Sequence, residues 1–148
     1  MSDNHAKQGK TYSVIVSRQD KIHGQAAARQ HTLTLNIERG GTEAGFNAAE
    51  TLLAALGTCV LTNVNSYIQK MRLQVDDVRI ELAGIRQDNP PMLTDIHYRL
   101  MLDSREPADK LQALHDVSVR NGTVTNTLMH GIQPQGEVII TQRESDSQ

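Results

Sequence analysis

The chain has 148 residues, which is most simply one domain (1–148) with room for a sizeable hydrophobic core. Its net charge of −2 and its 3% aromatic content, without a basic cluster, argue against a nucleic-acid-binding protein. The N-terminus is polar, and the dense apolar run 52–61 is too short for a hydrocarbon layer of about 30 Å, so we expect a cytoplasmic protein without a membrane partner.

Two segments in the first quarter of the chain alternate apolar and polar residues, as half-buried strands do. These are 11–17 (TYSVIVS) and 31–37 (HTLTLNI). The residues between them, 19–25, are predicted to form a turn, and the stretch 38–47 is predicted to be a glycine-rich loop. Residues 1–10 and 143–148 are predicted to be loose tails.

A long helix is predicted from Ala48 to Arg72. Asn47 is a suitable N-cap, and Glu50 lies in the first turn, where the helix dipole favours an acid. Apolar residues recur every three or four positions: Leu53, Leu56, Val60, Val64, Tyr67 and Met71. The first half of the helix is apolar on all sides, so we expect it to be covered by sheet or by a second subunit.

The rest of the chain predicts a hairpin, helices and a final strand. The hairpin strands are 77–85 and 93–103, joined by a proline-containing turn. A helix over 107–119, a short helix over 121–131 and a strand over 136–141 (GEVIIT) follow. This order of elements predicts an α+β fold with helices packed on antiparallel sheet.

Cys59 is the only cysteine, so the chain has no intrachain disulfide. An unpaired cysteine usually packs as a small hydrophobic residue, and it becomes reactive where a nearby cation stabilises the thiolate. The histidines show no metal-ligand spacing, and we expect no metal and no cofactor. They are His5, His23, His31, His97, His115 and His130.

The stretch 45–64 (GFNAAETLLAALGTCVLTNV) resembles the first-cysteine helix of the OsmC/Ohr family, the osmotically inducible and organic hydroperoxide resistance proteins. The resemblance implies an intertwined homodimer in which antiparallel sheets wrap two long central helices. It also implies reduction of organic hydroperoxides: a thiolate attacks the peroxide, and a second cysteine condenses with the resulting sulfenic acid to give a disulfide.

Carried over by position, the resemblance implies that Cys59 is the peroxidatic cysteine and that Arg39 and Glu50 support its thiolate. Ala49 stands where the OsmC branch has its glutamate, and Glu50 matches the glutamate of the broader family. Gly122 stands in the position of the second cysteine, within GTVTNTL (122–128). The two-cysteine cycle therefore cannot run within one chain.

The spacing of Glu50 and Cys59 constrains any site that contains both. Nine residues along one helix correspond to about 13.5 Å of rise and place the side chains on opposite faces. If both serve one pocket, the glutamate comes from a second chain or the helix begins later than predicted.

Two main functions remain open from the sequence. The first is thiol-dependent reduction of organic hydroperoxides or related electrophiles by Cys59, with an external thiol as reductant. The second is a non-catalytic dimer that binds a small hydrophobic molecule, with Cys59 as core packing. A stress-associated protein with an unidentified partner is a third reading.

Overall fold

The computed structural model describes residues 9–141 and shows eight elements in an α+β order. They are β1 (Ile15–Arg18), β2 (His23–Ala28), β3 (His31–Asn36), α1 (Ala48–Lys70), β4 (Val75–Asp88), β5 (Pro91–Ser104), α2 (Ala108–Arg120) and α3 (Thr123–His130). The predicted α+β class is confirmed, and most of the predicted tails lie outside the described residues.

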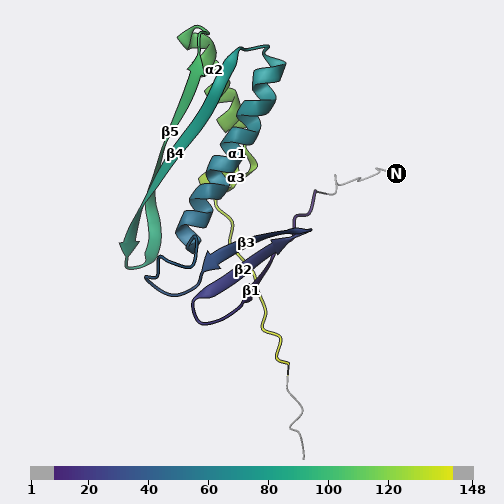
Figure 1. Ribbon diagram of the computed structural model, residues 1–148, viewed down its shortest axis with the longest axis vertical. Coiled ribbons are helices and arrows are strands. Elements are labelled where there is room, and N and C mark those ends of the chain that lie inside the picture. Colours follow the sequence, from purple (N-terminus) through teal and green to yellow (C-terminus); the bar gives the residue numbers. More distant parts are fainter. Residues whose placement is uncertain (1–8, 142–148) are drawn as a thin grey trace, which may run out of the picture.

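The strands form two separate antiparallel sheets, one of order β1-β2-β3 and one hairpin of β4 and β5. The hairpin runs alongside α1, and α2 and α3 pack on the same helix. The three-stranded sheet lies beyond the N-terminal end of α1 (Figure 1). The core therefore sits between α1, the hairpin and the two shorter helices.

The central strand β2 was predicted as part of a turn, and this prediction is wrong. Its sequence, HGQAAA, has no β-branched or aromatic residue, so local propensity gives no strand signal. Pairing on both sides makes it a strand, with β1 along one edge and β3 along the other. At Gly24 a Cβ atom would lie 2.7 Å from Ile37 Cγ2, so any residue larger than glycine at this position would require the Ile37 side chain to move.

The predicted N-terminus of α1 is confirmed by a capping box. Asn47 Oδ1 accepts a hydrogen bond from the Glu50 backbone N–H at 2.9 Å, and Glu50 Oε1 accepts one from the Asn47 N–H at 3.3 Å. Such a cap contributes about 0.5–2 kcal/mol. Glu50 therefore has a structural role at the helix end, and the helix ends two residues before the predicted Arg72.

One side of α1 is covered by the chain and the other is not. Leu56, Val60 and Val64 are buried in the core with Leu73 and Leu114. Gly57 allows β4 to approach closely, since a Cβ there would lie 2.9 Å from Leu82 Cδ1. Ala55, on the opposite side, and Leu52, near the N-terminal end of the helix, are exposed. The apolar first half of α1 predicts that the helix is covered on all sides, and the single chain covers it only in part.

By length and composition alone α1 is long and apolar enough to cross a membrane. The sequence analysis did not indicate this, because it considered only the shorter dense run 52–61. The core helices of soluble proteins share this property. The contacts of α1 with β4, α2 and α3 are those of a core helix.

The hairpin strands are longer than predicted, leaving only Asn89 and Pro90 as the turn. Its apolar positions alternate as expected and pack against the core: Val78, Ile80, Leu82, Ile96, Leu100 and Leu102.

Tyr98 on β5 and His115 on α2 join the two elements, with 2.7 Å between the phenol oxygen and His115 Nε2. Burial is the main cause that raises the pKa of Tyr98 above its usual range, so the phenol stays protonated.

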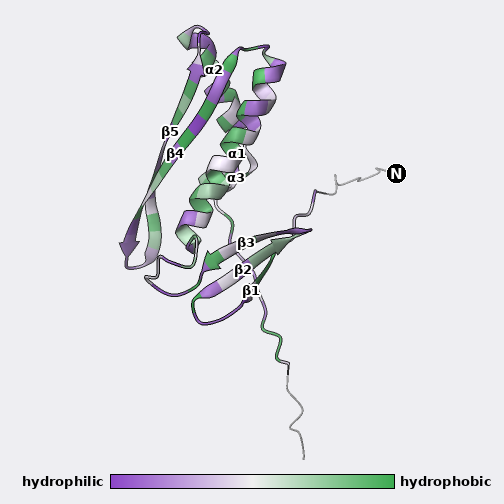
Figure 2. Cartoon of the chain, in the orientation of Figure 1, coloured by the Kyte–Doolittle hydropathy of each residue, from purple (hydrophilic) through white to green (hydrophobic). Residues whose placement is uncertain are grey.

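The prediction of a strand over 136–141 is wrong, because this segment is irregular. Val138, Ile139 and Ile140 are each 79–87% exposed, and Figure 2 shows apolar residues along this extended stretch. A strand needs a neighbour to receive its backbone hydrogen bonds, and no strand within residues 9–141 pairs with it. The apolar run 138–140 therefore has no strand partner among the described residues.

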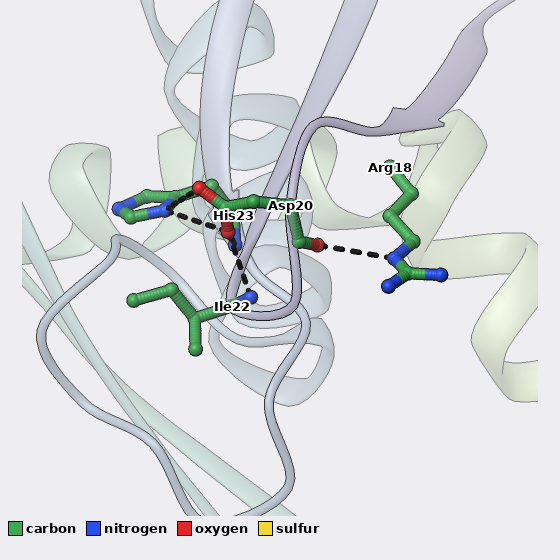
Figure 3. A network of polar contacts seen from close by, with 4 residues as sticks. All are labelled: Arg18, Asp20, Ile22 and His23. Atoms are coloured by element: carbon green, nitrogen blue, oxygen red, sulfur yellow. Dashed lines mark hydrogen bonds and ion pairs between the residues drawn. The ribbon is translucent and has the colours of Figure 1, made fainter.

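Asp20 organises the turn between β1 and β2 (Figure 3). Its Oδ1 accepts hydrogen bonds from the backbone N–H of His23 at 2.7 Å and of Ile22 at 2.8 Å, and the His23 ring lies 2.7 Å from Oδ2. Arg18 Nε donates to the Asp20 carbonyl at 3.2 Å. The backbone donors of His23 and Ile22, followed by the His23 ring, lower the pKa of Asp20 from 3.8 to about 2.

We predict that the Asp20→Asn variant is less stable than the wild type at neutral pH and that the difference disappears in acid. Because the folded pKa is depressed, the stabilisation from Asp20 is present above about pH 4 and is lost as pH falls through about 2. Urea unfolding of both proteins between pH 2 and 7 measures this difference. A stability difference that stays constant down to pH 2 would contradict the proposed role of the charge.

Candidate functional site

Cys59 lies in the middle of α1 and is partly exposed. A mid-helix position gives the sulfur no contact with free backbone N–H groups, which occur at helix N-termini. Neighbouring side chains and the packing of other elements therefore decide its surroundings.

The junction between α2 and α3 is packed against α1 at Cys59. Asn63, one turn after Cys59, donates from Nδ2 to the Ser118 carbonyl oxygen at 2.9 Å. Ser118 lies one turn before Gly122, so this bond sets the register that brings Gly122 to the sulfur. A Cβ atom at Gly122 would lie only 3.0 Å from Cys59 Sγ. The structure thus places Cys59 and Gly122 side by side, the positions at which the OsmC/Ohr resemblance implies the two cysteines.

Thr125 is the site residue that the sequence analysis missed. It is only 9% exposed, and its Oγ1 lies 2.7 Å from the Cβ position of Gly122. This hydroxyl has no hydrogen-bond partner among residues 9–141. A threonine in a short helix gives no functional signal in a single sequence, because its orientation depends on how α3 packs on α1.

Arg39 and Glu50 are not brought to Cys59 within the chain. Arg39 lies in the exposed loop after β3, and Glu50 is held in the capping box. Since α1 is continuous from Ala48, the alternative of a later helix start is excluded. Glu50 and Cys59 are therefore about 13.5 Å apart along the axis, on opposite faces of one helix.

Within residues 9–141 no group of three or more His, Cys, Asp and Glu side chains is arranged to hold a metal ion. The chemistry that this site can support with its own atoms is that of one partly exposed sulfur with a buried hydroxyl nearby.

Comparison with protein families decides the relationship. The family model described as OsmC-like protein matches residues 40–135, which span the glycine-rich loop, α1, the hairpin and both shorter helices. The chain belongs to the OsmC-like protein family. The earlier resemblance, which rested on the α1 region, is thereby confirmed.

Solved structures show the same OsmC-like fold at low sequence identity. An OsmC-like protein from Mycoplasma pneumoniae is 19% identical with a TM-score of 0.73, covering 81% of this chain and 88% of its own. A putative osmotic stress induced and detoxification response protein from Psychrobacter arcticus is 16% identical with a TM-score of 0.70, covering 86% and 91%. The organic hydroperoxide resistance protein OhrB of Bacillus subtilis is 14% identical with a TM-score of 0.55, covering 80% and 90%. No curated protein matches the sequence.

We predict that Gly122→Ala destabilises this OsmC-like protein by about 1–3 kcal/mol, the usual cost of overpacking. The new methyl group would meet Cys59 Sγ at 3.0 Å and Thr125 Oγ1 at 2.7 Å. Gly122 has φ −83°, so the backbone adds no strain and the effect is steric. Thermal or urea unfolding measures the change.

Gly136→Ala is the matched control, because a Cβ there meets no atom within 4 Å. Equal stability of Gly122→Ala and Gly136→Ala would show that the α2–α3 junction does not approach Cys59 as described.

Proposed function

We propose that this protein reduces organic hydroperoxides or related electrophiles, with Cys59 as the nucleophile and an external thiol as the reductant. The contact between the partly exposed Cys59 and the glycine at the α2–α3 junction carries the proposal. Family membership supports it, since structural relatives include organic hydroperoxide resistance proteins. Those relatives are under 25% identical and supply the fold alone.

The proposed reaction has three steps. The Cys59 thiolate attacks one peroxide oxygen, the O–O bond breaks, and the alkoxide takes up a proton and leaves as an alcohol. Cys59 is now a sulfenic acid, and an external thiol displaces its oxygen as water to form a mixed disulfide. A second external thiol attacks the mixed disulfide, releases the external disulfide and restores Cys59. An external thiol is required because the chain has one cysteine.

We propose that Arg39 and Glu50 reach the site from a second copy of the chain. Arg39 would stabilise the thiolate and the departing oxygen, and Glu50 would orient Arg39. Two observations support a second copy as the source. The axial separation on α1 prevents Glu50 from reaching Cys59 in the same chain, and Leu52 and Ala55 in the first half of α1 are exposed.

The surface supports an intertwined homodimer in the same way. Large apolar side chains of the N-terminal sheet and its flanks are exposed, far more than scattered surface residues explain. They include Tyr12, Val14, Ile15, Val16, Leu33, Ile37 and Phe46. A second copy would cover this surface and offer a neighbouring strand to the segment 136–141.

We propose a cytoplasmic location for the protein, because thiol reductants are maintained in that compartment.

Binding of a small hydrophobic molecule is the second candidate function. A hollow of about 320 Å³ lies between β5 and α2, within the usual size range of ligand pockets. Leu100, Leu102 and Leu111 line it, and Tyr98 and His115 provide a polar end. In this reading Cys59 is packing.

We predict that the Cys59 thiol is lost stoichiometrically when the protein is mixed with cumene hydroperoxide and that dithiothreitol restores it. One cumyl alcohol forms per thiol lost, because the displaced alkoxide is the product of the first step. Stopped-flow mixing followed by thiol counting and product analysis measures both. Cys59→Ser should show no reaction above background.

Arg39→Ala should slow the loss of the thiol by about tenfold or more, since a cation near a thiolate favours the ionised form. Arg105→Ala, which removes an exposed arginine between β5 and α2, is the matched control and should react like the wild type. Survival of the Cys59 thiol in excess hydroperoxide would rule out the peroxidase proposal and leave the ligand-binding candidate.

A further inference from the structure

A buried hydroxyl without a partner lies next to Cys59. Thr125 Oγ1 and Cys59 Sγ are both close to the Cβ position of Gly122, at 2.7 and 3.0 Å, and only a hydrogen atom occupies that side of the glycine. The two atoms make no hydrogen bond to each other. The sulfur and the hydroxyl are therefore neighbours without a bond between them.

Thr125 is buried without a hydrogen bond, whereas four other helical threonines satisfy their hydroxyl groups within their own helix. Thr51, Thr58, Thr62 and Thr127 each donate a hydrogen bond to the carbonyl oxygen four residues earlier. Thr125 is in the first turn of α3, whose N-cap is Gly122, so no helical carbonyl lies four residues before it. Leaving a buried hydroxyl without a partner costs free energy, which an acceptor oxygen on the neighbouring sulfur would recover.

From these contacts we propose that the Thr125 hydroxyl hydrogen-bonds the oxygen of the Cys59 sulfenic acid and thereby prolongs the life of this intermediate until an external thiol arrives. The inference rests on the proposed function, because it requires that Cys59 be oxidised. The new oxygen is bonded directly to Sγ, next to Oγ1, and it can accept the hydrogen bond that the Thr125 hydroxyl donates to no other residue.

The hydrogen bond matters because this chain has no second sulfur to consume the sulfenic acid at once. The acid must wait for a diffusing thiol, and during that time further peroxide can oxidise it to the sulfinic acid, which thiols do not reduce. A donor on the sulfenate oxygen holds electron density away from the sulfur and slows this second oxidation. Thr125 is therefore a positioning residue for the intermediate, distinct from the residues that activate the thiolate.

The test compares Thr125→Val, which keeps the shape and removes the hydroxyl, with wild type, Thr125→Ser and Thr127→Val. Each full-length protein is treated with one equivalent of cumene hydroperoxide without thiol, and excess hydroperoxide is then added. Dimedone trapping and mass spectrometry follow the sulfenic and sulfinic forms of Cys59. Thr127→Val is the matched control on α3, because Thr127 is exposed and bonds only within the helix.

We expect the sulfenic acid of Thr125→Val to be lost about tenfold faster than that of the wild type, the effect of one hydrogen bond to a charged group. The first oxidation should change by less than about threefold. Thr125→Ser should retain most of the wild-type lifetime, and Thr127→Val all of it, which separates loss of the hydroxyl from a general loss of packing.

Equal sulfenic acid lifetimes in wild type and Thr125→Val would overturn the inference and leave the proposed function standing. A similar fast loss in Thr125→Ser and Thr125→Val would also overturn it, because the hydroxyl would then have no effect. A wild-type Cys59 that never forms a sulfenic acid would overturn both the inference and the proposed function.

Discussion

The uncovered side of α1 is the constraint on which the rest of the molecule depends. The helix is apolar on all sides in its first half, and the hairpin, α2 and α3 cover one side only. Burial of Leu56, Val60 and Val64 on that side fixes the core and the position of the α2–α3 junction. Ala55 on the other side and Leu52 near the N-terminal end of α1 are exposed, which leaves apolar surface that a second copy of the chain can bury.

The packing of the junction at Gly122 gives the site its chemical character. The glycine lets the junction approach the only cysteine closely, since a Cβ atom there would lie 3.0 Å from Sγ, and a buried hydroxyl without a partner lies at the same place. In the proposed reaction an external thiol is the reductant, and the proposed hydrogen bond from Thr125 protects the oxidised sulfur until that thiol arrives. The site thus differs in its resolving step from the two-cysteine cycle that the family resemblance implies.

The sequence predicted the elements that carry a strong periodic signal. The cap at Asn47, the alternation of the hairpin and the helix after Pro107 were correct because local chemistry decides them. Strand β2 was missed because pairing on both sides, and not the residues HGQAAA, makes it a strand. The segment 136–141 (GEVIIT) was predicted to be a strand, but a strand needs a neighbour that the described chain does not supply.

For the site, the sequence could single out Cys59 and the missing second cysteine, because both are matters of residue identity. It could not find Thr125, whose role depends on how α3 packs against α1. The distance between Glu50 and Cys59 followed from helix geometry, and the continuous α1 leaves a second chain as the source of any shared pocket.

The most direct test of this account is the mass of the full-length protein in solution, measured by sedimentation equilibrium at micromolar concentration. We expect twice the mass of one chain, and we expect Leu52→Lys to shift the protein toward the monomer by placing a charge in the exposed apolar surface near the N-terminal end of α1. A folded wild-type monomer at these concentrations would contradict the account, because α1 would then remain uncovered and neither Glu50 nor Arg39 could be supplied by a partner.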